Sequence, residues 1–321
     1  MVGDIGATNA RFALVAPGSS DIENIQSLKC EDFDNIQSAI SFYISSFLEL
    51  DIVSACFATA GTVHLDVFKL ANNHWTINKS DVAKTLNGVT IKWINDFTAQ
   101  AFATTTLTDS EVITLNKGIV KPEKLRLVIG PGTGLGVCGL IMSPSGWLPI
   151  AGEGGHSDFA PNTSIEYEIL TLLAKKFGHV AVERILSGPG IMNLYEALCQ
   201  INGKDRIYTT PSEITAAAVN AGADPIADET IQMFCKIFGS VAGSMALTVG
   251  ALGGVYITSD LVRNFIDLFI ESDFQKSFES KGRLQPVLED IPVYLSKKKN
   301  MGLIGTVYEI NNYWMQKGFK V

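Results

Sequence analysis

The sequence has few cysteines, and their spacing excludes several classes of site. Its 321 residues include five of them (Cys30, Cys56, Cys138, Cys199 and Cys235), and no two form a CxxC pair. An odd number of scattered cysteines predicts reduced thiols in a cytoplasmic protein rather than a disulfide framework or a zinc site. We expect no metal centre built from protein ligands alone.

Long apolar runs, a leader segment and an excess of positive charge are lacking as well. The longest apolar segment, residues 231–249, is interrupted by Lys236, Ser240 and Ser244, whereas a membrane span needs roughly 18–20 uninterrupted apolar residues. The first residues carry no basic segment followed by an apolar one, so secretion is not expected. The net charge of −8 disfavours nucleic acid, whose binding relies on basic surface. We therefore expect a cytoplasmic protein that binds neither membranes nor nucleic acids.

What the sequence does have is enough apolar material for two α/β domains, with 46% hydrophobic residues. Strand-like apolar runs alternate with runs of helical period, which predicts α/β architecture. The expected strands cover residues 11–16, 54–58, 63–71, 89–94, 125–129, 254–258 and 291–295, and the expected helices cover residues 36–50, 98–104, 162–177, 228–249 and 303–315. Residues 105–110 are a candidate hinge, and residues 210–213 (TPSE) predict a capping box at a helix start.

Two glycine-rich segments are candidates for binding phosphate. Residues 3–9 (GDIGATN) and 130–136 (GPGTGLG) each adjoin an expected strand, and small residues let backbone N–H groups approach a phosphate closely. In the first segment Asp4 would meet the metal that accompanies a nucleoside triphosphate, although an ordinary hairpin turn is an equal alternative. The pair of similar loops hints at an internal duplication.

The second glycine segment overlaps a GxGxxG pattern at residues 134–139. A dinucleotide-binding fold would need a helix next. Residues 137–142 are instead β-compatible and lead through a Pro-Ser-Gly turn into residues 147–150, which predicts a hairpin. No GxxxxGK[ST] sequence is present, so the P-loop ATPases are excluded.

A polar pair follows the expected strand 89–94. A carboxylate at the carboxyl end of a parallel strand, such as Asp96, lies where α/β enzymes bind ligands. It can orient a hydroxyl nucleophile and remove its proton late in phosphoryl transfer. An Asx turn or a helix N-cap at Asn95 and Asp96 is the structural alternative.

Residues 152–158 (GEGGHSD) place polar side chains among glycines, as in a loop pressed against a polar ligand such as a sugar. A solvated loop is one alternative. A metal site in which His156 and Asp158 join His179 is another. Glu183, taken alone, is a solvated or ion-paired residue, and Gly188 is expected to end a helix, after which Pro189 and Gly190 restart the chain.

Together and in this order, these segments closely resemble the bacterial glucokinase family of the hexokinase/actin/Hsp70-type ATPase superfamily. The matching segments are GDIGATNARFALV (3–15), NNHW (72–75), INDFTA (94–99), GPGTGLGV (130–137), GEGGHSDFAP (152–161) and ERILSGPGIMNLY (183–195). LGGVYI (252–257), FESKGR (278–283), IPVYL (291–295) and MGLIG (301–305) extend the resemblance over nearly the whole chain. The cysteine-rich zinc motif of the related repressor/kinase family is absent.

The resemblance implies an α/β chain with the two-domain actin-like ATPase (ribonuclease H-like) fold and an interdomain cleft. Residues 1–106 with 298–321 are expected to form the small domain, and residues 107–297 the large domain. The resemblance also suggests a homodimer.

The resemblance further implies roles for individual residues. Asp96 looks like the catalytic base that takes the proton of the sugar's 6-hydroxyl. The residues expected to bind the sugar are Asn95, Asp96, Glu153, His156 and Glu183. Those expected to hold the phosphates of ATP with Mg²⁺ are Gly3, Asp4, Ile5, Gly6, Ala7, Thr8, Gly132, Thr133 and Gly134.

This chain departs from the family pattern in three places. Ala7 stands where the family usually has glycine, and its methyl group is costly only if the site demands a positive φ. Ser259 and Asp260 replace a Gly-Gly pair near the adenosine, where they would crowd or repel the nucleotide unless Asp260 accepts a ribose hydroxyl. Only Val2 lies between Met1 and the first glycine, so the expected first strand is shorter than the family's, as in a chain with a truncated start.

The expected function is glucokinase activity (ATP:D-glucose 6-phosphotransferase): ATP-dependent phosphorylation of glucose at the 6-hydroxyl to glucose 6-phosphate, feeding glycolysis, with Mg²⁺. One alternative is a sugar-binding regulatory protein that has lost efficient catalysis. Others are a kinase for another hexose or an N-acetylhexosamine, or an enzyme that uses a different phosphoryl donor such as ADP or polyphosphate.

Overall fold

The computed structural model of the protein describes residues 1–61, 63–70, 73–220 and 222–318. The chain packs into two compact units. The first unit contains Met1–Leu107, Ser143–Pro149 and the chain from Lys298 onward, and the second contains Thr108–Met142 and Ile150–Lys297. The domain boundaries expected from the sequence differ from these units at Leu107 and at Ser143–Pro149, and they stay a prediction.

The first unit is built on a five-stranded sheet with the order β3-β2-β1-β4-β7. Its strands are β1 (Val2–Ile5), β2 (Asn9–Leu14), β3 (Glu23–Lys29), β4 (Ser54–Thr59) and β7 (Thr90–Asn95), and β5 (Val67–Lys69) pairs with β6 (Thr76–Asn78) in a separate ribbon. Strands β1, β4 and β7 run parallel, and β2 and β3 are added antiparallel. Every residue of β4 is buried, which accounts for its unbroken run of small and apolar residues.

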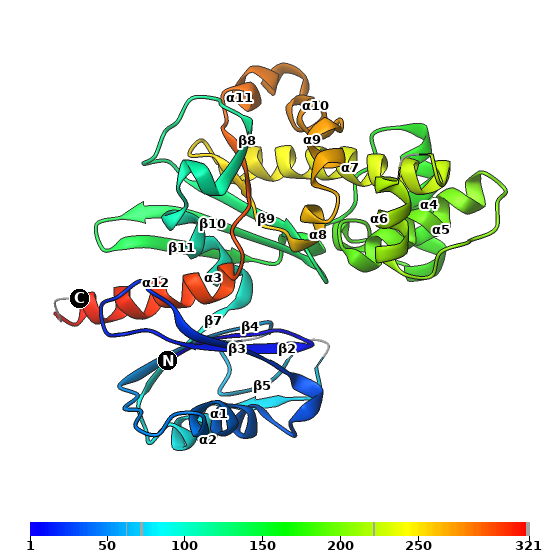
Figure 1. Cartoon of the computed structure of the whole chain (residues 1–321). Coiled ribbons are helices and arrows are strands. Elements are labelled where there is room, and N and C mark those ends of the chain that lie inside the picture. The colour runs from blue at the N-terminus through cyan, green and yellow to red at the C-terminus, as the bar shows by residue number, and fades with distance from the viewer. Residues whose placement is uncertain (62, 71–72, 221, 319–321) are drawn as a thin grey trace. The chain divides into compact units, whose positions relative to one another are not determined.

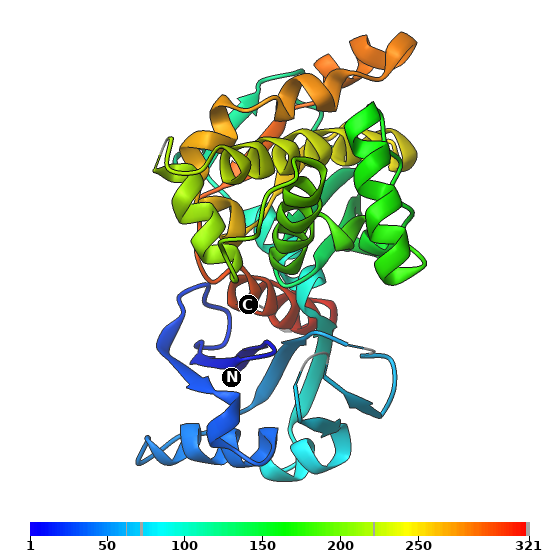
Figure 2. The same ribbon diagram turned by 90° about the vertical axis from the view of Figure 1, so that its right-hand side faces the viewer.

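Helices cover both faces of this sheet. Helices α1 (Ile36–Ser45) and α2 (Lys79–Thr85) lie on one face, and α3 (Asp96–Ala103) and α12 (Met301–Gln316) lie on the other (Figures 1 and 2). A Cβ atom built on Gly305 would lie 1.7 Å from the carbonyl oxygen of Ala99. Helices α12 and α3 therefore touch at their backbones, which only glycine permits.

The second unit is built on a six-stranded sheet with the order β11-β10-β9-β12-β13-β8. Its strands are β8 (Val112–Asn116), β9 (Arg126–Pro131), β10 (Leu135–Ser143), β11 (Gly146–Gly152), β12 (Val255–Ile257) and β13 (Val293–Ser296). Strands β9, β12 and β13 are parallel, and β10 pairs antiparallel with β9. The predicted hairpin after the second glycine segment is confirmed, so the dinucleotide-binding reading of GxGxxG is wrong.

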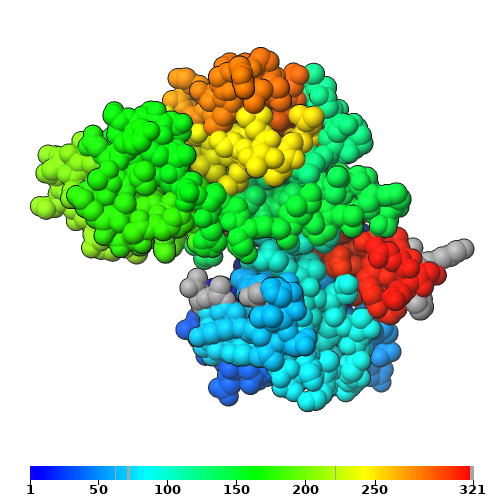
Figure 3. All heavy atoms as spheres, turned by 180° about the vertical axis from the view of Figure 1, so that it is seen from behind, coloured from blue at the N-terminus to red at the C-terminus, as the bar shows by residue number. Residues whose placement is uncertain are grey.

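The helices of the second unit gather around a long central one. They are α4 (Ser164–Phe177), α5 (Gly188–Ile201), α6 (Pro211–Val219), α7 (Pro225–Val249), α8 (Asp260–Arg263), α9 (Ile266–Glu271), α10 (Phe274–Glu279) and α11 (Gln285–Glu289). In the space-filling view the segments from α4 to α6 form one continuous green mass (Figure 3). Helix α10 packs closely on α7, since a Cβ atom on Gly239 would lie 2.0 Å from the carbonyl oxygen of Phe274.

Five strands occur in the same order in both units. The order β3-β2-β1-β4-β7 of the first corresponds to β11-β10-β9-β12-β13 of the second, and a glycine-rich turn joins β1 to β2 as another joins β9 to β10. The repeated order supports the internal duplication suggested by the two glycine segments.

Several expected boundaries are wrong, each for a local reason. The helix expected to reach residue 50 ends at Ser45, and Leu48 beyond it is fully exposed rather than on a buried face. Helix α7 begins at Pro225 rather than residue 228, because Asp224 caps it by accepting a hydrogen bond from the N–H of Ile226 (2.8 Å). Of the expected strand 63–71 only β5 forms, and residue 71 lies outside the described residues.

Gly188 begins a helix instead of ending one. Ser187 is the N-cap of α5, its Oγ accepting from the N–H of Gly190 (3.0 Å), and Pro189 occupies the first turn. The predicted capping box at Thr210 and Glu213 is confirmed at the start of α6.

One described helix, α7, is long and apolar enough to cross a membrane by length and composition alone. In the structure 61% of its most apolar window is buried inside the protein. Phe238 of α7, for example, packs edge-on against Phe274 with ring centroids 5.2 Å apart. Burial of this kind is what the core helix of a globular unit shows.

Candidate active site

The three parallel strands of the first unit end in a common row. Ile5 of β1 is paired with Thr59 of β4, and Thr59 with Asn95 of β7. The loop that starts at Gly6 and the residue Asp96 therefore leave the sheet at the same edge, about 10 Å apart as two strand spacings require. This is the edge at which α/β proteins bind ligands.

Asn95 and Asp96 form the start of helix α3. Asn95 Oδ1 accepts hydrogen bonds from the N–H groups of Phe97 (2.9 Å) and Thr98 (3.1 Å), so the amide caps the helix. One carboxylate oxygen of Asp96 accepts a hydrogen bond from the N–H of Phe97 (2.8 Å). The capping alternative raised by the sequence is thus correct for Asn95, and its amide NH₂ group is the part that could meet a ligand.

Asp4 is the second carboxylate of this edge. It lies within β1, and Arg11 of β2 contacts it at 3.5 Å. Burial raises the pKa of Asp4 to about 6, a rise that Arg11 opposes and the neighbouring Asp96 carboxylate adds to. Two carboxylates that influence each other at a ligand-binding edge make a centre where a cation would relieve repulsion.

The first glycine loop is held by a residue far along the chain. The side-chain amide of Asn73 donates to the carbonyl oxygens of Gly6 (3.3 Å) and Ala7 (3.0 Å), while its own Oδ1 accepts from the N–H of Trp75 (2.8 Å). Asn73 was not among the expected site residues, although it falls in the NNHW segment; Asn72 of that segment lies outside the described residues.

Ala7 causes no backbone strain in the first loop. Among described residues other than glycine, positive φ angles occur at Asn24, Asn87 and Asn300, and so not at Ala7. The methyl group that departs from the family pattern is therefore tolerated at little cost.

The second glycine loop, between β9 and β10, is tied down by three neighbouring elements. The N–H of Gly188, at the start of α5, donates to the carbonyl oxygen of Gly132 (2.8 Å). Ser259 Oγ donates to the carbonyl oxygen of Pro131 (2.5 Å) and accepts from the N–H of Val262 (3.0 Å). The third contact is made by Glu183, which bonds to the N–H of Leu135 directly after the loop.

The sequence led to the expectation that Ser259 crowds the nucleotide near the adenosine, which stays a prediction; in the structure its hydroxyl is bonded to this loop. Its side chain is buried and links the loop to helix α8. Asp260 differs, because its side chain is 82% exposed and pairs with Arg263 in the next turn. Only the second residue of the Ser-Asp pair presents its side chain to solvent.

Glu183 lies in a short 3-10 helix, Val182–Arg184, against the second glycine loop. Its Oε2 accepts a hydrogen bond from the N–H of Leu135 (2.8 Å). A Cβ atom on Gly134 would lie 2.3 Å from the same oxygen, so glycine is required there for the carboxylate to approach. Glu183 is half-buried and bonded to the backbone of the loop, which differs from the solvated or ion-paired residue that its sequence position favoured.

The polar loop 152–158 packs on the same strand. Gly154–His156 form a 3-10 turn, and a Cβ atom on Gly155 would lie 2.3 Å from the carbonyl oxygen of Leu135. Nε2 of His179 lies 2.6 Å from Oδ1 of Asp158, and both side chains are largely exposed. No group of three metal-ligating side chains is found among the described residues, so the alternative of a metal site at His156, Asp158 and His179 has no support.

The structure thus gathers the expected residues in two sets. The first unit brings together the loop of Gly3–Thr8, Asn95 and Asp96; the second brings together Gly132–Gly134, Glu183 and the loop that carries Glu153 and His156. The assignment of these residues to sugar, phosphate and catalysis stays a prediction.

The fold and this pair of glycine loops define an actin-like ATPase of the sugar-kinase class, and comparison with solved structures agrees. The crystal structure of a glucokinase from an Antarctic psychrotroph matches with a TM-score of 0.86 and 32% identity, covering 97% of this chain and 98% of that one. A glucokinase from Balamuthia mandrillaris in complex with glucose matches with a TM-score of 0.80 and 22% identity, over 96% and 92% of the two chains. The predicted fold class is confirmed.

Sequence comparison identifies the family. The Glucokinase family profile matches residues 1–312. A glucokinase from Hahella chejuensis is 47% identical over 312 residues, 97% of each chain, and one from Marinobacter nauticus is 42% identical over the same lengths. The chain therefore belongs to the glucokinase family, and the predicted enzyme class, an ATP-dependent glucokinase, is confirmed at the level of the family.

Proposed function

We propose that this chain transfers the γ-phosphoryl group of ATP to the 6-hydroxyl of glucose, giving ADP and glucose 6-phosphate for glycolysis. Membership of the glucokinase family supports the reaction. The structural observation that carries the proposal is the shared carboxyl edge of β1 and β7, which presents the first glycine loop and Asp96 together. A base next to a phosphate loop is the minimum that phosphoryl transfer to a hydroxyl needs.

In this mechanism Asp96 orients the sugar hydroxyl and takes its proton as the new O–P bond forms and the bond to the ADP oxygen breaks. The hydrogen bond from Phe97 N–H fixes one carboxylate oxygen of Asp96 at the start of α3. Asn95, Glu153, His156 and Glu183 are assigned to the other hydroxyls. Gly3, Ile5, Gly6, Ala7 and Thr8, with Gly132, Thr133 and Gly134, are assigned to the phosphates through their backbone N–H groups.

Mg²⁺ is part of the proposal, and the residues present fit it. Asp4 supplies carboxylate oxygens, which are the ligands a hard cation prefers. Burial and the nearby Asp96 carboxylate raise the pKa of Asp4 despite its contact with Arg11, which is consistent with a place for a cation beside it. Bound Mg²⁺ would supply charge neutralisation on the β- and γ-phosphates.

We further propose that the protein acts in the cytoplasm as a homodimer and binds neither nucleic acid nor membrane. The net charge of −8 supports the absence of a nucleic-acid partner. Sedimentation measured with the full chain tests the oligomeric state.

A coupled assay for glucose 6-phosphate tests the reaction. It would be run with ATP, ADP and polyphosphate as donors and with glucose, mannose, fructose and N-acetylglucosamine as acceptors. The proposal expects the highest kcat/KM for ATP with glucose. A higher value for another pair would replace the substrate assignment, and binding of glucose without turnover or nucleotide affinity in calorimetry would identify a sugar sensor instead.

A further inference from the structure

Parts of the second unit that the proposed function assigns to different substrates meet at a single residue, Leu135. The N–H of Leu135, the first residue of β10, donates to Glu183, which is assigned to the sugar. The carbonyl oxygen of Leu135 is in close contact with Gly155 of the loop that carries Glu153 and His156. Leu135 itself directly follows Gly132–Gly134, the turn assigned to phosphate.

This contact is built into the fold rather than being a chance surface approach. Leu135 is buried, with 6% of its surface exposed. Glu183 is fixed from its own side as well, because its carbonyl oxygen accepts a hydrogen bond from Ser187 Oγ (2.8 Å). Gly188, one residue beyond that cap, bonds through its N–H to Gly132. The segment from Glu183 to Gly188 therefore holds the glycine turn at two points.

The contact with Leu135 involves only one of the two carboxylate oxygens of Glu183. Oε2 accepts from Leu135, whereas Oε1 is the oxygen left to accept a hydroxyl hydrogen. A sugar hydroxyl on Oε1 would restrict the rotation of the whole carboxylate, and with it the position of Oε2 and of the glycine turn. The same restriction acts in the opposite direction when a phosphate fixes the turn.

We propose that Glu183 is a positioning residue for the phosphate-binding turn Gly132–Gly134 and links nucleotide binding to sugar binding through the N–H of Leu135. The inference rests on the proposed function in taking this turn as a phosphate site. The inference does not depend on which hexose is the acceptor. It can therefore be wrong while the proposed phosphorylation of glucose is right.

The test measures nucleotide affinity in the absence of sugar. Calorimetry with AMPPNP and Mg²⁺ on the full chain would compare Glu183→Ala with the wild type. Loss of one charge-assisted hydrogen bond predicts a Kd about tenfold higher. Glu153→Ala is the matched control, because it removes another glutamate assigned to the sugar, and its sugar-free Kd for AMPPNP should stay unchanged.

A second variant breaks the same contact from the other side. Gly134→Ala puts a methyl group where Oε2 of Glu183 now lies, so it should weaken glucose binding about tenfold in the absence of nucleotide. Neither variant should lower Tm enough to unfold the protein at the assay temperature, and Glu183→Gln, which keeps an acceptor for Leu135, serves if Glu183→Ala does not fold. Its nucleotide affinity should lie between those of the wild type and the alanine variant.

The outcomes separate the possibilities. An unchanged AMPPNP affinity in folded Glu183→Ala, or an unchanged glucose affinity in folded Gly134→Ala, would overturn the inference while leaving glucose phosphorylation intact. Equal loss of AMPPNP affinity in Glu153→Ala and Glu183→Ala would also overturn it, because the effect would then not pass through Leu135. Failure of the coupled assay with normal AMPPNP binding would instead count against the proposed reaction.

Discussion

A Cβ atom built on Gly302 would lie 2.5 Å from the carboxyl carbon of Asp4. Gly302 is in the first turn of α12, nearly three hundred residues along the chain from β1, and it lets the helix start approach this carboxylate directly. Favourable electrostatics at a helix N-terminus accompany such an approach. The MGLIG segment of the sequence therefore helps to position the Asp4 carboxylate at the ligand-binding edge of the first unit.

Gly302→Ala is expected to displace the Asp4 carboxylate and to lower kcat/KM for Mg·ATP at least about tenfold, a cost in the range of overpacking. The KM for glucose should change little. Gly305→Ala is the matched control, because its methyl group meets the backbone of Ala99 and should lower Tm. Steady-state kinetics over a range of Mg²⁺ concentrations would check the prediction, and a Gly302→Ala enzyme with normal kinetics would contradict it.

Asp96→Asn should lower kcat by about 10²–10⁴-fold, the usual contribution of a positioned base. The amide oxygen can still accept the hydrogen bond from Phe97 N–H, so the helix start should survive. Glucose affinity measured by calorimetry should therefore remain near the wild-type value. Near-normal turnover in this variant would remove Asp96 as the base.

Substitution of Asn73 should loosen the first glycine loop. Asn73→Ala loses the donor to Gly6 and Ala7, and Asn73→Asp keeps the acceptor for Trp75 but sets a carboxylate oxygen against two carbonyl oxygens. Both variants should raise the Kd for AMPPNP several-fold, with the aspartate variant at least as weak. A wild-type Kd in Asn73→Asp would show that only the bond to Trp75 matters.

Ser259→Ala is expected to destabilise the second unit by about 1–2 kcal/mol, since it removes both an N-cap and a buried hydrogen bond to Pro131. Asp260→Asn, which changes an exposed neighbour, should alter stability by about 0.5 kcal/mol or less. Urea unfolding of both variants gives the comparison. Equal effects of the two changes would mean that the link to Pro131 contributes nothing.

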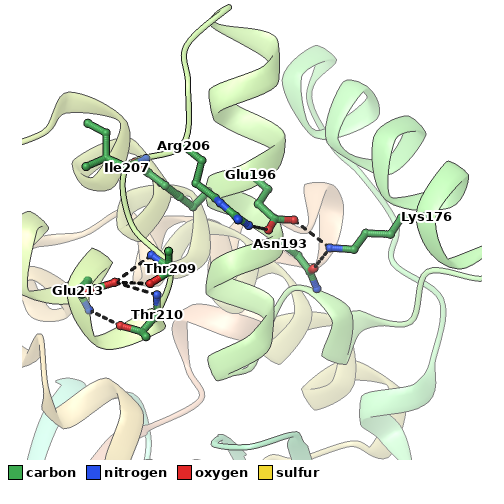
Figure 4. Close-up of polar contacts among 9 residues, drawn as sticks. Lys176, Asn193, Glu196, Arg206, Ile207, Thr209, Thr210 and Glu213 are labelled. Carbon is green, nitrogen blue, oxygen red and sulfur yellow. Dashed lines mark hydrogen bonds and ion pairs between the residues drawn. The ribbon is translucent and has the colours of Figure 1, made fainter.

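Glu196 provides a pH-dependent prediction. Figure 4 shows its carboxylate bridging Lys176 of α4 and Arg206, with the Lys176 contact at 2.9 Å. The hydrogen bond from Lys176, with further help from Arg206, lowers the pKa of Glu196 below its usual value. A lowered acid pKa stabilises the fold above the unfolded-state pKa, and that contribution is lost as the pH falls through the folded-state value.

Glu196→Gln should therefore lower the free energy of unfolding at pH 7 by about 1 kcal/mol or less, because the side chains are partly exposed. The Tm should fall slightly as a result. The difference from the wild type should shrink as the pH is lowered below about 4.5. Thermal unfolding at several pH values measures it. A difference that grows toward acid would mean that the sign of the pKa shift is wrong.

The sequence pointed to candidate site residues but not to the contacts that hold them in place. Segments such as INDF and GEGGH contain residue types that suit ligand binding, so Asp96 and the polar loop were proposed from the chain alone, and their roles stay a prediction. The contact of Glu183 with Leu135 could not be, because it joins residues 48 positions apart and depends on the absence of a Cβ atom at Gly134. Gly302 and Asn73 were missed for the same reason, since their partners are backbone or carboxyl groups of distant strands.

Local errors in the fold have a different origin. Gly188 followed by Pro189 reads equally well as a helix end or a helix start, and the deciding group is the hydroxyl of Ser187 that caps α5. Strand β3 escaped notice because most of its residues are exposed and polar, so periodicity gave no signal. Such elements are fixed by pairing with a neighbour rather than by their own composition.

Because α12 packs on β1, β4 and α3, the core of the first unit is completed by a helix that is synthesised after the whole second unit. On the ribosome, the part of this sheet face that α3 does not cover therefore stays exposed while nearly two hundred further residues emerge, and it is accessible to chaperones and to self-association during that time. A chain released by translation that stops before Met301 would contain the whole second unit and a first unit that lacks α12. The exposed sheet of that first unit would make the chain a target for quality-control proteases.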